Sequence, residues 1–118
     1  MAGFQSKRKM AMDKQEDMVR VVYNACHGGF GLKHKAEDRY WEIKGQPKPQ
    51  HWYDTDLCRH DPALLQVIDE MGLEAATAEY AELAITELPH GTKYFIDEYD
   101  GMETVRTIDD IVWSVAGE

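Results

Sequence analysis

The sequence predicts an α+β fold, in which a small, mainly antiparallel sheet carries two helices packed on one face. Three observations predict it. A β-branched and aromatic segment near the N-terminus is typical of a strand, two later segments repeat their apolar residues at helical spacing, and the C-terminal part alternates polar and apolar residues between tight turns. A length of 118 residues suits one domain that buries a core of its own.

An arm, a strand and a glycine-rich turn are predicted at the start of the chain. Residues 1–18 space their apolar side chains too loosely for an amphipathic face, so we expect a flexible N-terminal arm or a frayed helix there. A single domain at 19–118 follows. The residues VRVVY at 19–23 predict its first strand, which leads into the glycine-rich turn NACHGGFG at 24–31.

Two helices are predicted next. Residues 32–44 place their apolar side chains near one helical face and are followed by a glycine stop. The loop at 46–60 contains two prolines and is expected to be irregular. Asp61 is a suitable N-cap, Pro62 suits the first helical position, and Gly72 is the expected end of the second helix.

Three short strands are predicted near the C-terminus. Residues 81–88 have the alternation of a half-buried strand, and a Pro-His-Gly turn should return the chain as a hairpin partner at 93–99. An Asp-Gly dipeptide then predicts a tight turn, after which residues 102–106 are expected to pair as another strand. Residues 108–115 fit a closing strand or a last helical turn.

The charge of the chain is uneven. Residues 1–60 carry 11 basic and 8 acidic side chains, a balance of +3, whereas residues 61–118 carry 2 basic and 14 acidic ones, a balance of −12. The acidic half repels phosphate backbones and anionic lipid, so general nucleic-acid binding is not expected. It favours a solvated face that confers solubility, and it also suits a basic protein surface or mimicry of a nucleic acid.

The cysteine count and hydropathy indicate where the chain works. Two cysteines are too few for a disulfide scaffold, which favours a reducing cytoplasm. No apolar run approaches the ~20 residues of a membrane helix, so no membrane partner is expected.

The glycine-rich turn is the first candidate site. Glycines between a strand and a helix let backbone N–H groups converge on an anion, and the helix N-terminus adds a partial positive charge. Neither the phosphate-loop nor the dinucleotide fingerprint is present, and the glycines also suit a turn without a ligand. The expected ligand-binding residues, here and at the Asp-Gly turn, are Asn24, His27, Gly28, Gly29, Phe30, Gly31, Tyr99, Asp100 and Glu103.

The Asp-Gly turn is acidic. The segment 97–103 contains four carboxylates, which suit a divalent cation or the cationic part of a ligand. Strand alternation separates them onto two faces, so structural and functional interpretations of Asp100 and Glu103 both stay open. On the loop before the second helix, Trp52 and Tyr53 are candidates for stacking on a base or filling a partner's pocket.

The cysteines are weaker candidates. Cys26 could be a nucleophile beside a helix N-terminus, but its neighbour His27 should face the other way along the strand, which favours a buried structural cysteine. Cys26, His27, Cys58 and His60 are zinc-ligand types, but the paired ligands lack the usual two or more intervening residues. No metal, cofactor or catalytic residue is therefore assigned.

The motifs VVYNACHGGFGL at 21–32, RHDP at 59–62 and YFIDEYDGMETV at 94–105 resemble, as a set, a family of small uncharacterised proteins found mainly in bacteriophage and other viral genomes. The resemblance covers about residues 19–106. The N-terminal FQSKRKMA at 4–11 is similar to small phage accessory proteins. After the GGFGL turn, family members often have Ser-Asp-Glu-like residues where this chain has Lys-His-Lys.

This resemblance implies an origin and no reaction. The first interpretation is a non-enzymatic phage accessory protein in the cytoplasm of an infected host, with counter-defence or host takeover as its expected role. It would hold a small phosphorylated, nucleotide-like ligand at the Gly28–Gly31 turn, or dock its acidic half onto a basic host protein. A homo-oligomer stays open. The alternative is a small hydrolase or transferase that uses Cys26, His27, or the turn with Asp100 and Glu103.

Overall fold

The computed structural model describes residues 17–117. The arm expected at 1–18 falls almost entirely outside this range, and Met18 already belongs to the first strand. Within the described residues, two two-stranded antiparallel sheets and three α-helices make up an α+β fold, which confirms the predicted class.

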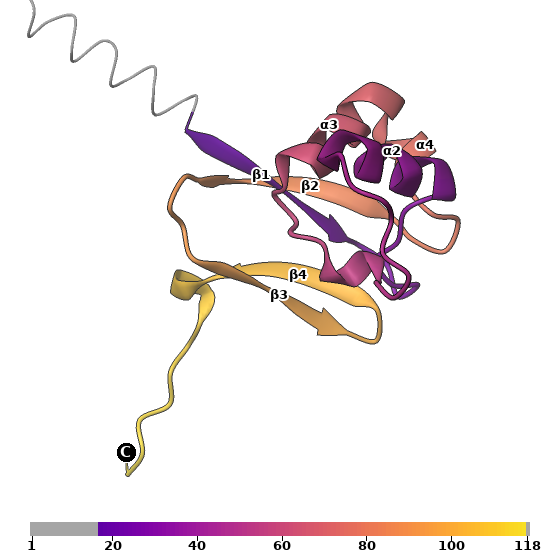
Figure 1. Cartoon of the computed structure of the whole chain (residues 1–118). Helices are drawn as coiled ribbons and strands as arrows, with labels where there is room; N and C mark the ends of the chain where they lie inside the picture. The colour runs from indigo at the N-terminus through magenta and orange to yellow at the C-terminus, as the bar shows by residue number, and fades with distance from the viewer. Residues whose placement is uncertain (1–16, 118) are drawn as a thin grey trace, which may run out of the picture.

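The strands β1 (Met18–Asn24) and β2 (Leu83–Pro89) form the central pair. Their register places Val21 opposite Thr86 and Val22 opposite Ile85. Both valines are fully buried, because β1 runs between the helices and the second strand pair (Figure 1).

The predicted pairing of 81–88 with 93–99 is wrong. The strand β2 pairs with β1, whereas β3 (Tyr94–Tyr99) pairs with β4 (Met102–Thr107). The Asp-Gly turn explains β3–β4, because Asp100 (φ 51°) and Gly101 (φ 89°) both adopt the positive φ of the turns that favour tight hairpins. The buried face of β1 needs a partner strand, and β2 supplies it from about sixty residues further along the chain.

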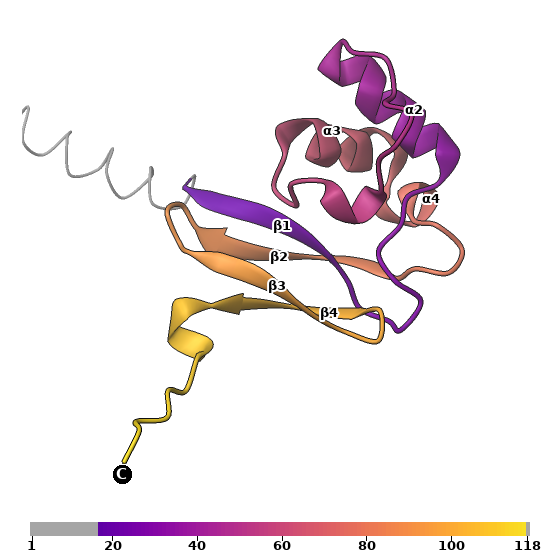
Figure 2. The same cartoon turned by 60° about the horizontal axis from the view of Figure 1, so that its bottom comes forward.

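Three helices cover one face of the β1–β2 pair, and the β3–β4 hairpin lies on the opposite side (Figures 1 and 2). The chain therefore forms two small sheets, where the sequence predicted one. Apolar side chains of α2 (His34–Lys44) and α3 (Pro62–Met71), with those of α4 (Leu73–Ala76), pack onto Val22 and Leu83. The hairpin contacts the central pair through β4 and β1.

The helix ends follow local chemistry. The Asp61 carboxylate accepts a hydrogen bond from the Ala63 amide at 2.8 Å, Pro62 is the first residue of α3, and Gly72 ends it, as predicted. The helix α2 ends at Gly45 in the left-handed conformation. At its start, Lys33 provides no side-chain cap.

The remaining segments are short. The short helix α4 follows Gly72 directly. The loop before α3 contains a 3₁₀ turn at Asp54–Asp56. Residues Ile108–Asp110 form another 3₁₀ turn in place of a closing strand. None of the helices at residues 17–117 is long and apolar enough to cross a bilayer.

Candidate functional site

The glycine-rich turn and the Asp-Gly turn lie against each other. The ring nitrogen Nδ1 of His27 lies 3.1 Å from the carbonyl oxygen of Asp100. A Cβ added at Gly101 would overlap the carbonyl of His27, so glycine is needed there for close approach as well as for its positive φ. The structure thus brings together two regions that the sequence separates by more than seventy residues.

Asn24 organises the contact between these turns. Its side chain is fully buried, and its Nδ2 donates to the carbonyls of Cys26 (2.6 Å) and Gly101 (2.8 Å). Its Oδ1 accepts from the Glu82 amide at 2.8 Å, and its own backbone amide donates to Glu103 at 2.9 Å. Through these hydrogen bonds, Asn24 connects the ends of β1, β2 and β4.

Glu103 forms a buried ion pair. Both its oxygens accept from the Arg59 guanidinium, at 2.5 and 2.8 Å, and each residue is 5% exposed. The guanidinium carbon also lies 3.7 Å from the centroid of the buried Phe30 ring. The carboxylate that the sequence suggested for a ligand is therefore satisfied by an internal cation, and it fixes β4 to the body of the fold.

The other predicted ligand residues divide into packed and exposed ones. A Cβ at Gly28 would overlap the backbone carbonyl of Tyr80, and one at Gly31 would overlap the Tyr80 hydroxyl, so Gly28 makes room for the backbone of Tyr80 and Gly31 for its side chain. His27, Tyr99 and Asp100 are exposed, with Tyr99 at 80%, and Gly29 is half-buried. Ligand binding at these four residues stays a prediction.

The two cysteines lie in different surroundings. Cys26 Sγ accepts from the amide of Gly28 at 3.4 Å and lies 3.4 Å from the Tyr80 carbonyl, which places it within its own turn. Cys58 is exposed, and its Sγ lies 3.5 Å from Nε2 of His60. Among residues 17–117, His, Cys, Asp and Glu side chains nowhere gather in threes that could hold a metal ion.

A pocket of about 400 Å³ lies on the Phe30 side of the glycine-rich turn, and we call it the aromatic pocket. Its wall combines four aromatic side chains from three separate segments with polar and ionisable groups. These residues include Phe30, Lys48, Trp52, Tyr53, Asp54 and Tyr80. The sequence singled out Trp52 and Tyr53, and the structure places both on this pocket.

Two carboxyl groups lie in contact in the aromatic pocket. Oδ2 of Asp54 accepts from the Leu32 amide at 2.8 Å. Glu37 Oε1 lies 3.1 Å from His34 Nδ1 and accepts from Lys48 Nζ at 3.2 Å. The other Asp54 oxygen, Oδ1, is buried and has no donor among the described residues.

The two carboxyls differ in protonation. Burial, and then the neighbouring Glu37, raise the pKa of Asp54 to about 7. Burial works in the same direction on Glu37, but hydrogen bonds with Asp54, Lys48 and His34 outweigh it and hold the Glu37 pKa below its usual value. As pH falls, Asp54 is therefore the first of the two carboxyls to bind a proton, and it is partly protonated near pH 7.

A larger hollow of about 810 Å³ adjoins the aromatic pocket, and we call it the helix hollow. The two share His34, Glu37 and Tyr80 in their walls, so they lie side by side, and we call the two together the depression at α2. Lys33 and Lys35 also line the helix hollow. The first amides of α2 have no partner within the helix and no side chain caps them, so this end has hydrogen-bond donors and a partial positive charge.

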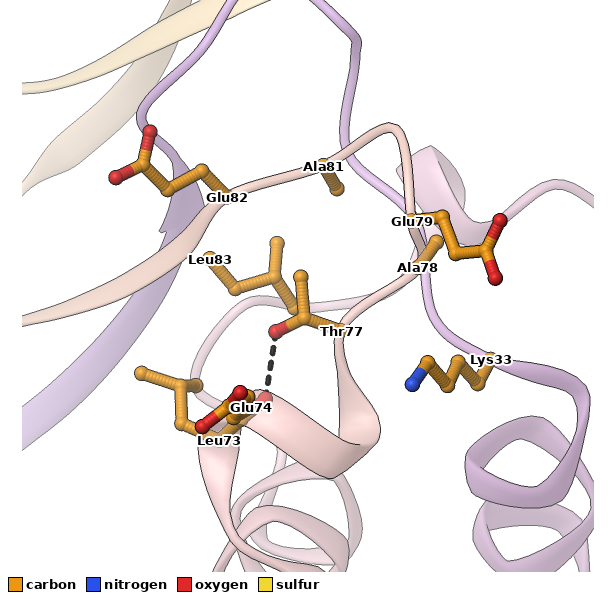
Figure 3. A pocket seen from close by; sticks show the side chains of 9 residues that line it. All are labelled: Lys33, Leu73, Glu74, Thr77, Ala78, Glu79, Ala81, Glu82 and Leu83. Carbon is orange, nitrogen blue, oxygen red and sulfur yellow. Dashed lines mark hydrogen bonds between the residues drawn. The ribbon is translucent and has the colours of Figure 1, made fainter.

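A third pocket, of about 510 Å³, continues on the other side of Lys33. Leu73, Ala78 and Leu83 give it an apolar lining, and Figure 3 shows three glutamates around it whose carboxylates point in different directions. These are Glu74, Glu79 and Glu82. Because the carboxylates do not converge, this pocket does not offer a set of ligands to a cation.

The sequence missed four members of the depression. They come from a helix, two parts of a loop and the segment before β2, and no spacing in the sequence links them: Glu37, Lys48, Asp54 and Tyr80.

Comparisons of the chain with protein-family models, with curated proteins and with solved structures found no match.

Proposed function

We propose that this chain is a binding protein for a small phosphorylated ligand with a flat ring, of the nucleotide class. One observation carries the proposal: a pocket with four aromatic side chains in its wall adjoins the lysine-bearing N-terminus of α2, which has no side-chain cap. The ligand would place its ring in the aromatic pocket and its phosphates in the helix hollow.

Aromatic side chains support the ring end of this proposal. Tyr53 and Tyr80 are both more than half exposed, so their rings are accessible to a ligand. Lys48 Nζ lies 5.7 Å from the centroid of the Trp52 ring, which adds a cation beside the aromatic surface. Stacking on such side chains is sequence-tolerant and stabilises bound bases by about 1–3 kcal/mol each.

The charge balance supports the phosphate end. Lys33, His34 and Lys35 are exposed at the helix start, where amide donors and the helix dipole favour an anion. The proton on Asp54 reduces the negative charge of the adjoining pocket near pH 7, and Glu37 is engaged by Lys48. In the wall of the helix hollow Lys33 and Lys35 stand beside Glu79, and Lys48 offsets Glu37, so the local balance for an anionic ligand is +1 although the chain as a whole is acidic.

The glycine-rich turn has an indirect part in this proposal. Phe30 lines the aromatic pocket, and Gly31 leaves the space that the Tyr80 ring occupies. The site is thus displaced from the Gly28–Gly31 backbone toward α2.

In a phage accessory protein, binding such a ligand would remove that ligand from a host response.

Titration calorimetry with ATP, adenosine and inorganic phosphate as probes tests the proposal. We expect ATP to bind best and Lys35→Glu to weaken ATP binding by about tenfold, with a smaller effect on adenosine. Lys93→Glu makes the same charge change at an exposed site on the segment before β3 and should have little effect. Equal losses in the two variants, or no binding of any probe at millimolar concentration, would exclude the proposed site.

A second candidate function is docking on a basic protein surface through the β3–β4 hairpin. The observation that favours it is exposed apolar area among carboxylates: Phe95 is 45% exposed, and Tyr99 lies between the exposed Glu98 and Asp100. Glu103 takes no part, because it is buried against Arg59. Such a surface suits a partner with basic and apolar side chains.

The rate of association with a basic partner tests this docking. Glu98→Lys with Asp100→Lys should slow association more than it speeds dissociation, and the effect should fade as salt rises. Glu74→Lys with Glu79→Lys is a matched control, because it makes the same charge change on α4 and on the segment after it, outside the hairpin. The same reduction in both double variants would indicate only net charge and would exclude a hairpin interface.

A further inference from the structure

Cys58 and His60 face the same side because the residue between them is anchored inside. Arg59 points inward to Glu103, and its backbone carbonyl accepts from the Val22 amide at 2.9 Å. Arg59 and His60 are the central residues of a turn, which the Asp61 amide closes by donating to the Cys58 carbonyl, and the residues on either side of Arg59 are both exposed. Their side chains accordingly meet at the surface, with Cys58 Sγ 3.5 Å from His60 Nε2.

A third group holds the imidazole from its other edge. The Tyr94 hydroxyl, at the start of β3, lies 2.5 Å from His60 Nδ1, and the two rings meet edge to face with centroids 5.7 Å apart. With the proton on Nδ1 donated to the Tyr94 oxygen, Nε2 is left free to accept the proton of Cys58. This is the order nucleophile, base and orienting group that activated thiols use.

The three side chains stand on fixed backbone. The Arg59–Glu103 ion pair ties the 58–60 segment to β4, and the Asp61 amide donates to the Cys58 carbonyl at 3.1 Å, just before α3. A hollow of about 310 Å³ adjoins the group, with His60 and Tyr94 in its wall next to Val19, Leu88 and Pro89. Its mainly apolar lining suits a short hydrocarbon chain.

We propose that Cys58 is a nucleophile that accepts short acyl groups from esters or thioesters, with His60 as its base and Tyr94 as a positioning residue. The hollow beside His60 and Tyr94 would receive the acyl chain. This site is separate from the depression at α2, so the proposal does not depend on the proposed ligand binding.

The chemistry uses only the acyl donor and water. The S–H proton of Cys58 passes to His60 Nε2 as Sγ bonds to the acyl carbon. The bond from that carbon to its leaving oxygen or sulfur then breaks, and the leaving group takes the proton from His60. A water molecule deprotonated by His60 finally attacks the Cys58 thioester, which releases the acid and restores the thiol.

Alkylation with iodoacetamide, followed peptide by peptide, tests whether the thiol is activated. We expect native Cys58 to react faster than Cys26, and His60→Gln to slow Cys58 by about tenfold while Cys26 keeps its rate. Tyr94→Phe keeps the ring but removes the hydroxyl, so it should change the pH profile of Cys58 alkylation. A Cys58 rate that is the same with and without His60 would overturn the proposal.

Release of p-nitrophenol from p-nitrophenyl butyrate tests acyl transfer. The full chain should release it and carry a butyryl group on Cys58, whereas Cys58→Ser and His60→Gln should fall to the background rate. Cys26→Ser should keep the wild-type rate, which separates this site from the other cysteine. Release that survives Cys58→Ser, or no release above background in the wild type, would overturn acyl transfer.

Discussion

Burial of the Asp54 carboxyl disfavours its charged form, although an aspartate is usually an ionised surface residue. The carboxyl accepts one backbone hydrogen bond from Leu32 and lies beside Glu37, and its pKa of about 7 leaves it partly protonated at neutral pH. This protonation lets a pocket with two acids lie next to the positive end of α2. The electrostatics of the depression therefore depend on a single proton.

Asp54→Asn should stabilise the protein more at high pH than at low pH. Because the Asp54 pKa is raised from its ordinary value to about 7, the folded state binds the extra proton and the free energy of unfolding falls as pH rises from about 4 to 7. Asparagine can donate to Glu37 without titrating. Its advantage over the wild type should be about 1–2 kcal/mol greater at pH 8 than at pH 5, after allowance for solvent screening.

Urea unfolding at both pH values measures this difference. Glu37, whose pKa is lowered, affects stability only below its usual value and so outside this window. Asp56→Asn, in the same 3₁₀ turn, controls for the exchange of side chain. An Asp54→Asn advantage that is constant from pH 5 to pH 8 would contradict the raised pKa of Asp54.

Among the elements, the β3–β4 hairpin depends most on one contact. Glu103 is the one fully buried residue of its two strands, and it is held by Arg59 and the Asn24 amide. The hairpin's own turn is local, but its attachment to β1 is an ion pair across distant parts of the chain. Removing one partner of such a buried pair leaves an uncompensated charge.

Glu103→Gln should therefore cost about 3–5 kcal/mol in free energy of unfolding, because it strands the Arg59 guanidinium in the interior. Asp97→Asn is the matched control on the same hairpin. Its ion pair with Arg106 is about 45% exposed on both sides, so its loss should cost about 1 kcal/mol or less. Similar costs for the two variants, measured by chemical unfolding, would show that the buried pair does not hold the hairpin.

Asp61→Ala should destabilise α3 and the packing of α2 together. The carboxylate caps α3 through Ala63 and also accepts from the Tyr40 hydroxyl at 2.7 Å and from Lys44 at 3.2 Å. We expect a loss of about 2 kcal/mol by thermal unfolding, with Asp61→Asn retaining most of the cap. A loss below about 0.5 kcal/mol for Asp61→Ala would contradict this joint role.

Over the whole molecule, packing is uneven between its layers. The helices and the β1–β2 pair enclose the apolar core, whereas most side chains of the β3–β4 hairpin are partly or fully exposed. The acidic half of the chain includes the hairpin and α3, so carboxylates lie on both sides of the central pair. Local opening should therefore begin at the hairpin.

Amide hydrogen exchange should separate these layers. We expect the paired amides of β3 and β4 to exchange at least about tenfold faster than those of Val21 and Val22, because little apolar area covers the hairpin. Glu103→Gln should widen this difference, whereas Asp97→Asn should not. Equal protection of the two strand pairs would instead indicate one cooperative unit.

The sequence by itself determined the features that arise from neighbouring residues. The β-branched run of β1, the Asp61 and Pro62 start of α3, the Gly72 end and the Asp-Gly turn are local preferences of backbone and side chain, and each was predicted. Trp52 and Tyr53 stood out as large aromatics on a proline-containing loop. The α+β class followed from the same local signals.

The tertiary structure decided which strands pair and which charges meet. Two antiparallel partners of similar alternation were available to β2, and the burial of Val21 and Val22 under the helices selected β1. Glu103 changed from a candidate ligand to half of a buried ion pair because Arg59 reaches it across 44 residues of sequence. The contacts of Asp54 with Glu37 and of Tyr94 with His60 likewise join segments that are far apart in the sequence. No local preference of the backbone brings such segments together, so only the folded chain establishes these contacts.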